Sequence, residues 1–172
     1  MAGALAGIGC PALASPASEA PVRVESARYN SVSRPEQILD RKRSTVRALA
    51  CEASVPPDFA LAVLDKESGF DNDMRGSRGE IGVSQILPST AASLGLDVKR
   101  LEREFAYNVR AGIKILQRLL AEARGDKAKA LRVYRAGPRW TTLPPRPRSW
   151  VQAYSSAVFE LMRTRYAGVA CQ

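Results

Sequence analysis

Apolar side chains recur every three or four positions over residues 105–124, and this spacing restricts the fold of the chain more than any other feature. The side chains that form this stripe are Val109, Ile113, Leu116, Leu120 and Ala123. Such spacing places them along one face of an α-helix, which can be buried against other elements. The alternation of apolar and polar residues that marks a β-strand is scarce. The pattern therefore predicts an all-α fold with minimal β-structure, built as a single helical domain.

Proline, glycine and capping residues divide the rest of the chain into further segments. Helices are expected over residues 33–53, 57–68, 88–94, 105–124 and 126–136, with a last helix opened by Ser149. The glycine-rich residues 69–82 and the proline-rich residues 143–148 are expected to form loops. Core positions expected in the first and last helices are Ile38, Val46, Leu49, Val151, Tyr154, Val158, Leu161 and Met162.

Composition limits the chemistry open to the chain. Its 172 residues, 45% of them hydrophobic, are enough to enclose one core. Lys and Arg number 26 against 17 Asp and Glu, and the net charge of +9 favours a polyanionic partner such as nucleic acid, anionic lipid or an acidic polymer. The absence of histidine excludes Ser-His-Asp and Cys-His nucleophile systems and histidine-bearing zinc sites. Carboxylates, hydroxyls or amines must carry any reaction, and no metal or organic cofactor is implied.

The first 20 residues are small and apolar, with no charge before Glu19. They resemble the apolar core and cleavage zone of an export signal, with Ala12-Leu13-Ala14 as a cleavage site, although the basic n-region is missing and a flexible leader is the alternative. A lipoprotein signal around Cys10 fits the sequence less well. Residues 21–32 are polar and aperiodic and predict a linker, so the domain is expected over residues 33–172. The protein is expected to be periplasmic or otherwise exported.

Removal of such a leader would leave two cysteines, Cys51 and Cys171. An even number of cysteines in an oxidising compartment suggests a disulfide between them. The alternative is a buried thiol at Cys51 and a frayed terminus at Cys171.

Glu67 places a charge on the side of a helix that otherwise faces the core. Phe59, Val63 and Glu67 are spaced by four residues and share one face. Apolar surroundings favour the neutral carboxyl group, and a glutamic acid that stays protonated near neutral pH can protonate a leaving-group oxygen. Alternatively, Glu67 extends into solvent or pairs with Arg75 or Arg78. The adjoining glycine-rich loop, which can border a cleft, favours the catalytic interpretation.

Three short blocks follow one another along the chain. They are Glu67-Ser68, GEIGVSQILPSTA from Gly79 to Ala91, and VYRAGP from Val133 to Pro138. The helical segment NVRAG, from Asn108 to Gly112, lies between the second and the third. Together they resemble the signature blocks of the soluble lytic transglycosylases, peptidoglycan-cleaving relatives of goose-type lysozyme. The similarity extends over about residues 36–166.

The resemblance implies a lysozyme-like fold in which Glu67 is the sole catalytic acid and base. In that family's chemistry the glutamic acid protonates the glycosidic oxygen between N-acetylmuramic acid and N-acetylglucosamine. The carboxylate then accepts the proton of the muramic acid's C6 hydroxyl group, which closes a 1,6-anhydro ring. Most glycosidases instead need two carboxyl groups at a set separation.

The resemblance also assigns roles to neighbouring residues. Gln85 would hydrogen-bond the sugar, Tyr134 would face the catalytic glutamate, and Ser68 would contribute to the substrate site, mainly by supporting the loop. Val83-Ser84 replaces the family's usual Leu-Met pair. Arg135 replaces the usual asparagine after the tyrosine, where it either meets muropeptide carboxylates or is a solvated surface charge.

Two other functions remain open from the sequence. A hydrolysing muramidase would use Asp71, Asp73 or Glu80 as a second carboxylate that positions water. A non-catalytic module would hold peptidoglycan or nucleic acid through basic side chains. For the transglycosylase we expect a monomer without a transmembrane segment that acts on glycan strands, with a secretion apparatus as a possible partner and no nucleic acid.

Overall fold

The computed structural model describes residues 33–138 and 140–171, and the folded unit begins at Arg34. The predicted leader, the linker and Cys10 lie outside the described residues. The helices are α2 (Arg34–Glu52), α3 (Pro57–Ser68), α4 (Pro88–Ser93), α5 (Val98–Arg103), α6 (Phe105–Glu122), α7 (Lys127–Ala136) and α8 (Pro145–Thr164), with a 3-10 turn η1 (Trp140–Thr142). Over the described ranges β-structure is limited to isolated bridges in the α3–α4 loop, at Arg75–Ile81 and Ile81–Ile86. The predicted all-α fold is confirmed.

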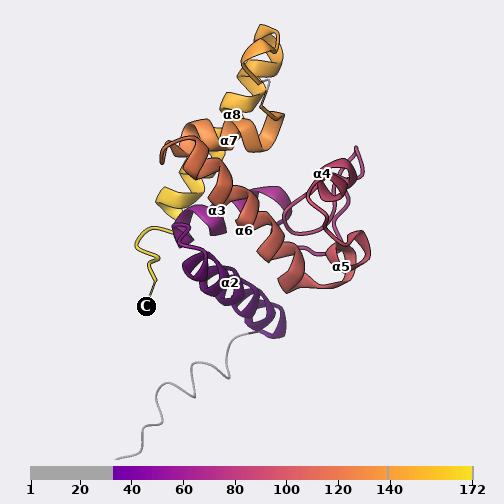
Figure 1. Ribbon diagram of the computed structural model, residues 1–172. Helices are drawn as coiled ribbons and strands as arrows, with labels where there is room; N and C mark the ends of the chain where they lie inside the picture. The colour runs from indigo at the N-terminus through magenta and orange to yellow at the C-terminus, as the bar shows by residue number, and fades with distance from the viewer. Residues whose placement is uncertain (1–32, 139, 172) are drawn as a thin grey trace, which may run out of the picture. The chain divides into compact units, whose positions relative to one another are not determined.

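Helix α3 forms the centre of this unit. Every residue from Phe59 to Leu64 is buried, so the helix is enclosed on all sides rather than along one stripe. Helices α2, α6 and α8 pack against it, as Figure 1 shows. Gly69 ends α3 in the left-handed conformation, with φ of 62°. The last turn of α3, which carries Glu67 and the buried Ser68, therefore follows directly from the enclosed part of the helix.

Two sequence predictions need correction, and one helix was missed. Ile38 is 49% exposed instead of buried, because the first half of α2 contacts the core through the neighbouring Leu39 and the buried positions, Val46, Leu49 and Ala50, lie in its second half. The last helix begins at Pro145 rather than Ser149, since proline in the first helical turn loses no intrahelical hydrogen bond. The short helix α5 was not predicted.

A disulfide joins Cys51, near the end of α2, to Cys171, with the two Cα atoms 5.7 Å apart. The segment after α8 is also held to α3 by Asp65, which accepts hydrogen bonds from Arg165 at 2.6 Å and from Tyr166 at 2.8 Å. The carboxyl-terminal residues are therefore fastened to both α2 and α3.

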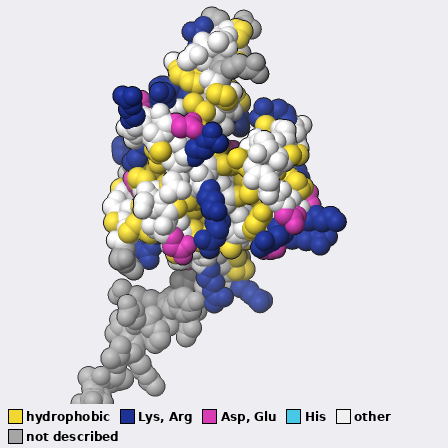
Figure 2. Space-filling view, viewed as in Figure 1, with side chains coloured by type: hydrophobic (Ala, Val, Ile, Leu, Met, Phe, Trp, Pro, Cys, Tyr) yellow, Lys and Arg dark blue, Asp and Glu magenta, His cyan; other side chains and the backbone are white. Residues whose placement is uncertain are grey.

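Charged side chains are dispersed over the visible surface. On the face in Figure 2, Lys and Arg lie among apolar and acidic side chains instead of forming one continuous patch. Within the described residues, none of the helices is long and apolar enough to cross a bilayer.

Candidate active site

Glu67 lies in the last turn of α3, one residue before its end. Phe59 and Val63, which precede it on the same face, are fully buried, while Glu67 itself is partly buried. The Oη atom of Tyr154 on α8 donates a hydrogen bond to Glu67 Oε1 at 2.6 Å. The carboxyl group is thus set between the core and the surface, with one oxygen held by a tyrosine.

The surroundings raise the pKa of Glu67 above its usual value of 4.5. Burial is the main cause, because it disfavours the charged form. The hydrogen bond from Tyr154 and the positive charges of Arg135 and Lys66 lower the pKa, whereas the negative charge of Glu80 raises it further. The balance favours a carboxyl group that keeps its proton to higher pH than a free glutamic acid does.

Tyr134 on α7 lies close enough for the charge of Glu67 to help raise the pKa of its phenol, after burial as the main cause. Its hydroxyl group donates to the backbone oxygen of Ser84 at 2.7 Å. Tyr154, predicted from the sequence only as a core residue, makes the direct bond to Glu67. The sequence signal for it was a hydroxyl-bearing ring within the apolar stripe of the last helix.

The loop between α3 and α4 is held by the residues that the motif singled out. The buried Ser68 hydroxyl group donates to the backbone oxygen of Val83 at 2.9 Å, so Ser68 positions the loop. Gln85, at φ of 46°, donates from its side-chain amide to the backbone oxygens of Gly82 at 2.8 Å and Met74 at 3.4 Å. Both side chains are therefore engaged within the protein, and a direct contact of Gln85 with sugar stays a prediction.

Asn108 on α6 connects this loop to the rest of the fold. Its Oδ1 accepts the Ser84 N–H at 2.8 Å, and its Nδ2 donates to the backbone oxygens of Ile81 at 3.1 Å and Leu101 at 3.0 Å. Ser84 Oγ in turn donates to the backbone oxygen of Asn108 at 3.1 Å. One turn further along α6, a Cβ atom at Gly112 would collide with Ser84 Oγ. The Asn-Val-x-x-Gly segment of α6 thus forms the surface against which the α3–α4 loop packs.

Of the three loop carboxylates that could assist Glu67, Glu80 and Asp71 are engaged elsewhere. Burial alone would raise the pKa of Glu80, but hydrogen bonds from the Arg78 backbone and guanidinium lower it, and the ion pair measures 2.7 Å. Asp71 accepts the backbone N–H of Asp73 at 2.9 Å, and both aspartates are exposed. Within the described part of the chain, no group of three or more Cys, Asp and Glu side chains is arranged to hold a metal ion.

Arginines stack on the two tryptophans near this site. The Arg135 guanidinium carbon lies 4.2 Å from the centre of the Trp150 ring and 5.4 Å from that of Tyr154. Arg132, one turn earlier on α7, lies 4.7 Å from the centre of a Trp140 ring. Arg135 is therefore not simply a solvated surface charge, because its guanidinium group stacks on the tyrosine that bonds Glu67.

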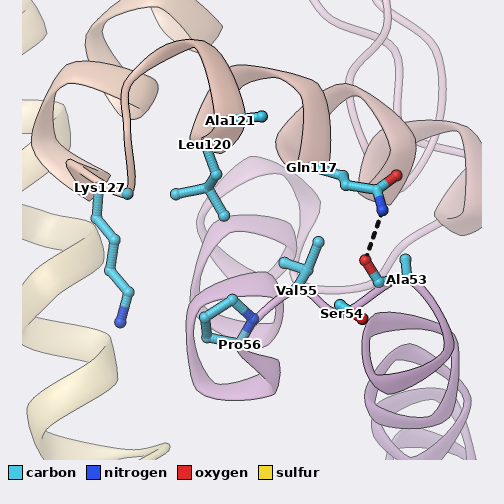
Figure 3. A pocket seen from close by; sticks show the side chains of 9 residues that line it. Ala53, Ser54, Val55, Pro56, Gln117, Leu120, Ala121 and Lys127 are labelled. Atoms are coloured by element: carbon cyan, nitrogen blue, oxygen red, sulfur yellow. Dashed lines mark hydrogen bonds between the residues drawn. The ribbon is translucent and has the colours of Figure 1, made fainter.

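A separate pocket of about 370 Å³ opens where the α2–α3 turn meets the end of α6 and the start of α7 (Figure 3). Gln117 donates to the backbone oxygen of Ala53 across it, at 2.7 Å. Its lining residues are Ala53, Ser54, Val55, Pro56, Gln117, Leu120, Ala121, Gly125 and Lys127. No carboxyl group lines it, and it shares no residue with the surroundings of Glu67, so it does not supply acid catalysis.

Comparisons with known proteins bear on the family and on the fold. The family model of the Transglycosylase SLT domain matches residues 44–143. A crystal structure of an inactive glutamate-to-glutamine variant of the lytic transglycosylase Slt from Pseudomonas aeruginosa has a similar fold, with a TM-score of 0.58 at 20% sequence identity. The match covers 74% of this chain and 25% of that one, so this chain corresponds to about a quarter of the length of that enzyme. The family match includes Glu67, the α3–α4 loop, Asn108 and Tyr134, whereas Tyr154 on α8 lies beyond it, and the chain belongs to the transglycosylase SLT domain family.

Proposed function

We propose that the protein is a peptidoglycan lytic transglycosylase that cleaves the β-1,4 bond between N-acetylmuramic acid and N-acetylglucosamine, with Glu67 as its only acid and base. The observation that carries the proposal is the carboxyl group of Glu67, which is partly buried, has a raised pKa and is bonded by Tyr154. Among the described residues, Glu67 forms no ion pair that would keep it charged. Such a group can donate a proton near neutral pH.

The hydrogen bond also assigns the proton to one oxygen. Because Tyr154 donates to Oε1, the proton of the acid form resides on Oε2 and points away from the tyrosine. Transfer of this proton to the glycosidic oxygen breaks the bond to the muramic C1 atom and leaves a carboxylate. That carboxylate accepts the proton of the C6 hydroxyl group while the C6 oxygen bonds to C1, which closes the anhydro ring and restores the acid. Tyr154 stabilises the carboxylate between the two steps.

A hydrolysing muramidase is less well supported by the same geometry. Hydrolysis needs a second carboxylate that activates water or forms a covalent intermediate. Glu80 is held by Arg78, and the exposed Asp71 caps its own turn. None of the three loop acids bonds to Glu67 or to its tyrosine partner in the described contacts.

The remaining expectations follow from this proposed activity. Peptidoglycan lies outside the cytoplasmic membrane, so we propose an exported protein, and a disulfide between Cys51 and Cys171 suits an oxidising compartment. The catalytic domain would span residues 33–172 after a leader and a linker, and would act as a monomer on glycan strands. A secretion apparatus as recruiting partner is an expectation from the family resemblance alone.

Product analysis in ¹⁸O-labelled water tests the proposal with a Glu67→Gln variant. Wild-type protein should release muropeptides with anhydro ends and without ¹⁸O, and Glu67→Gln should lower the rate by at least about a hundredfold, since acid–base groups contribute about 10² to 10⁴. Glu122→Gln is the matched control, because Glu122 is exposed and paired with Arg118. Reducing ends that carry ¹⁸O would establish hydrolysis instead, and an active Glu67→Gln variant would remove Glu67 from the mechanism.

A further inference from the structure

Arg135 occupies an unusual position beside the proposed acid. It lies in the last turn of α7, and its guanidinium group stacks on two rings of α8, those of Trp150 and Tyr154. These rings are four residues apart and share one face of α8. Tyr154 bonds to Glu67, and the charge of Arg135 is among those that lower the pKa of Glu67. The arginine therefore belongs to the surroundings of the reacting carboxyl group.

The charge of Arg135 has no anionic partner of its own within the described residues. The structure pairs it with no carboxylate there, and its buried Nε atom has no hydrogen-bond acceptor. Stacking on aromatic rings is attractive but satisfies none of the five guanidinium N–H donors. Trp150, on which Arg135 stacks, is 51% exposed, so the stack lies at the surface where a ligand can reach it. An arginine pre-positioned in this way is suited to bind a carboxylate.

We propose that Arg135 binds a carboxylate on the C3 substituent of the muramic acid whose bond Glu67 cleaves. The inference rests on the proposed function, because it takes the substrate from there. A substituent on the sugar ring that carries the scissile bond lies close to the catalytic acid. Arg135 is also close to the acid, because it stacks on the tyrosine that bonds Glu67. The carboxylate has two sources: the free lactyl group of a peptide-free strand, or an acidic residue of a stem peptide. Hydroxyl and acetamido groups, the other polar groups of the glycan, carry no charge to pair with the guanidinium.

A purely structural role for Arg135 has an internal comparison in Arg132. Both arginines lie on α7, both stack on a tryptophan, and both have a buried Nε without an acceptor in the described structure. Only Arg135 also stacks on Tyr154, and its positive charge helps to lower the pKa of Glu67. If stacking were the whole role, loss of either arginine would have the same consequence.

Equilibrium binding separates these two roles. In a Glu67→Gln background, which prevents turnover, dissociation constants are measured for three glycans of equal length: a chitooligosaccharide without carboxylates, a peptide-free muramic acid strand, and a peptide-bearing strand. Arg135→Met should weaken binding of at least one muramic acid strand about tenfold or more, the range of a charged hydrogen bond, and leave the chitooligosaccharide unchanged. The strand that loses affinity identifies the carboxylate. Arg132→Met should change none of the three.

Two outcomes would overturn the inference: an equal loss of affinity for all three glycans, or no loss for any of them. Arg135→Lys keeps the positive charge but lacks the planar guanidinium group, so it should recover part of the affinity. This variant also tests the inference if Arg135→Met does not fold. Failure of the proposed function has a different signature. Wild-type protein would then form no anhydro products, whereas selective loss of muramic acid binding in Arg135→Met would still support carboxylate recognition.

Discussion

Two regions of different construction meet at Glu67. On one side, the α3–α4 loop rests on α6, and its contacts are hydrogen bonds between side chains and backbone, made by Ser68, Gln85 and Asn108. On the other side, α7 and α8 present aromatic and cationic side chains, and Tyr154 reaches the carboxyl group itself. We call the first the loop seat and the second the ring face. The side chains of Ser68, Gln85 and Asn108 in the loop seat have their hydrogen-bond partners within the protein, while the ring face leaves donors available to a ligand.

The two regions contribute differently: the loop seat fixes the position of the loop, and the ring face affects the protonation of the carboxyl group. A buried donor or acceptor without a partner is costly, so the loop seat has little freedom to vary and its residues act on Glu67 only through the backbone they hold. The ring face tunes the carboxyl group directly, through one hydrogen bond and one nearby positive charge. We therefore expect changes in the loop seat to lower stability, and changes in the ring face to alter activity and its pH dependence.

The largest expected effect is that of Asn108→Ala in the loop seat. The substitution leaves the Ser84 N–H and the backbone oxygen of Leu101 without these partners in a buried site, while the backbone oxygen of Ile81 keeps only the hydrogen bond from the Ile86 N–H. With about 1 to 3 kcal/mol for each unsatisfied group, and partial compensation by water, the free energy of unfolding should fall by about 3 kcal/mol or more. Urea denaturation followed by circular dichroism measures it.

Gln117→Ala provides the matched control on the same helix. Gln117 also donates an amide hydrogen to a backbone oxygen, that of Ala53, but at an exposed position. Water can replace this bond, so the loss should be about 1 kcal/mol or less. Equal losses for the two variants would mean that the loop seat contributes no special stability.

The same division explains what could be predicted from the sequence. The 105–124 stripe and the capped 57–68 segment specify α6 and α3 because helical periodicity is local, and they place Glu67 on the core face of its helix. The bond between Tyr154 and Glu67 joins residues 87 positions apart, and a tyrosine in an apolar stripe looks like any other core residue. Helix α5 is six residues long, too short for periodicity, and depends on Asp97, which accepts the Arg100 N–H.

Tyr154→Phe should produce a smaller, kinetic effect at the ring face. Loss of the hydroxyl group removes a hydrogen bond that stabilises the carboxylate, so the pKa of Glu67 should rise further and the alkaline limb of kcat/KM should move to higher pH. The maximal rate should fall about tenfold, the worth of one charge-assisted hydrogen bond, because the carboxylate formed after proton transfer is less stable. Rates of muropeptide release over a pH series measure both changes.

Tyr166→Phe is the control for this experiment. Tyr166 donates to Asp65 on the same helix α3, so it makes the same kind of bond to a different carboxylate. The pH profile of that variant should coincide with the wild-type profile. A shift of equal size in both variants would show that the effect spreads through α3 and does not arise at Glu67.

The smallest expected effect is the pH dependence of stability that Glu67 itself produces. Its pKa is raised in the folded state above 4.5, so the stability it contributes is fully present below pH 4.5 and is lost as pH rises through the folded-state pKa. Glu67→Gln cannot titrate, and it should become progressively more stable than wild type over that window. Because the carboxyl group is partly exposed, the difference in the free energy of unfolding should stay below about 1 kcal/mol.

Denaturation of wild type and Glu67→Gln at a series of pH values gives this difference directly, since all other titrating groups are shared. Adding Tyr154→Phe to both proteins should enlarge the difference, because the ring face would then stabilise the carboxylate less. A difference that does not vary with pH would mean that Glu67 titrates as it does in the unfolded chain.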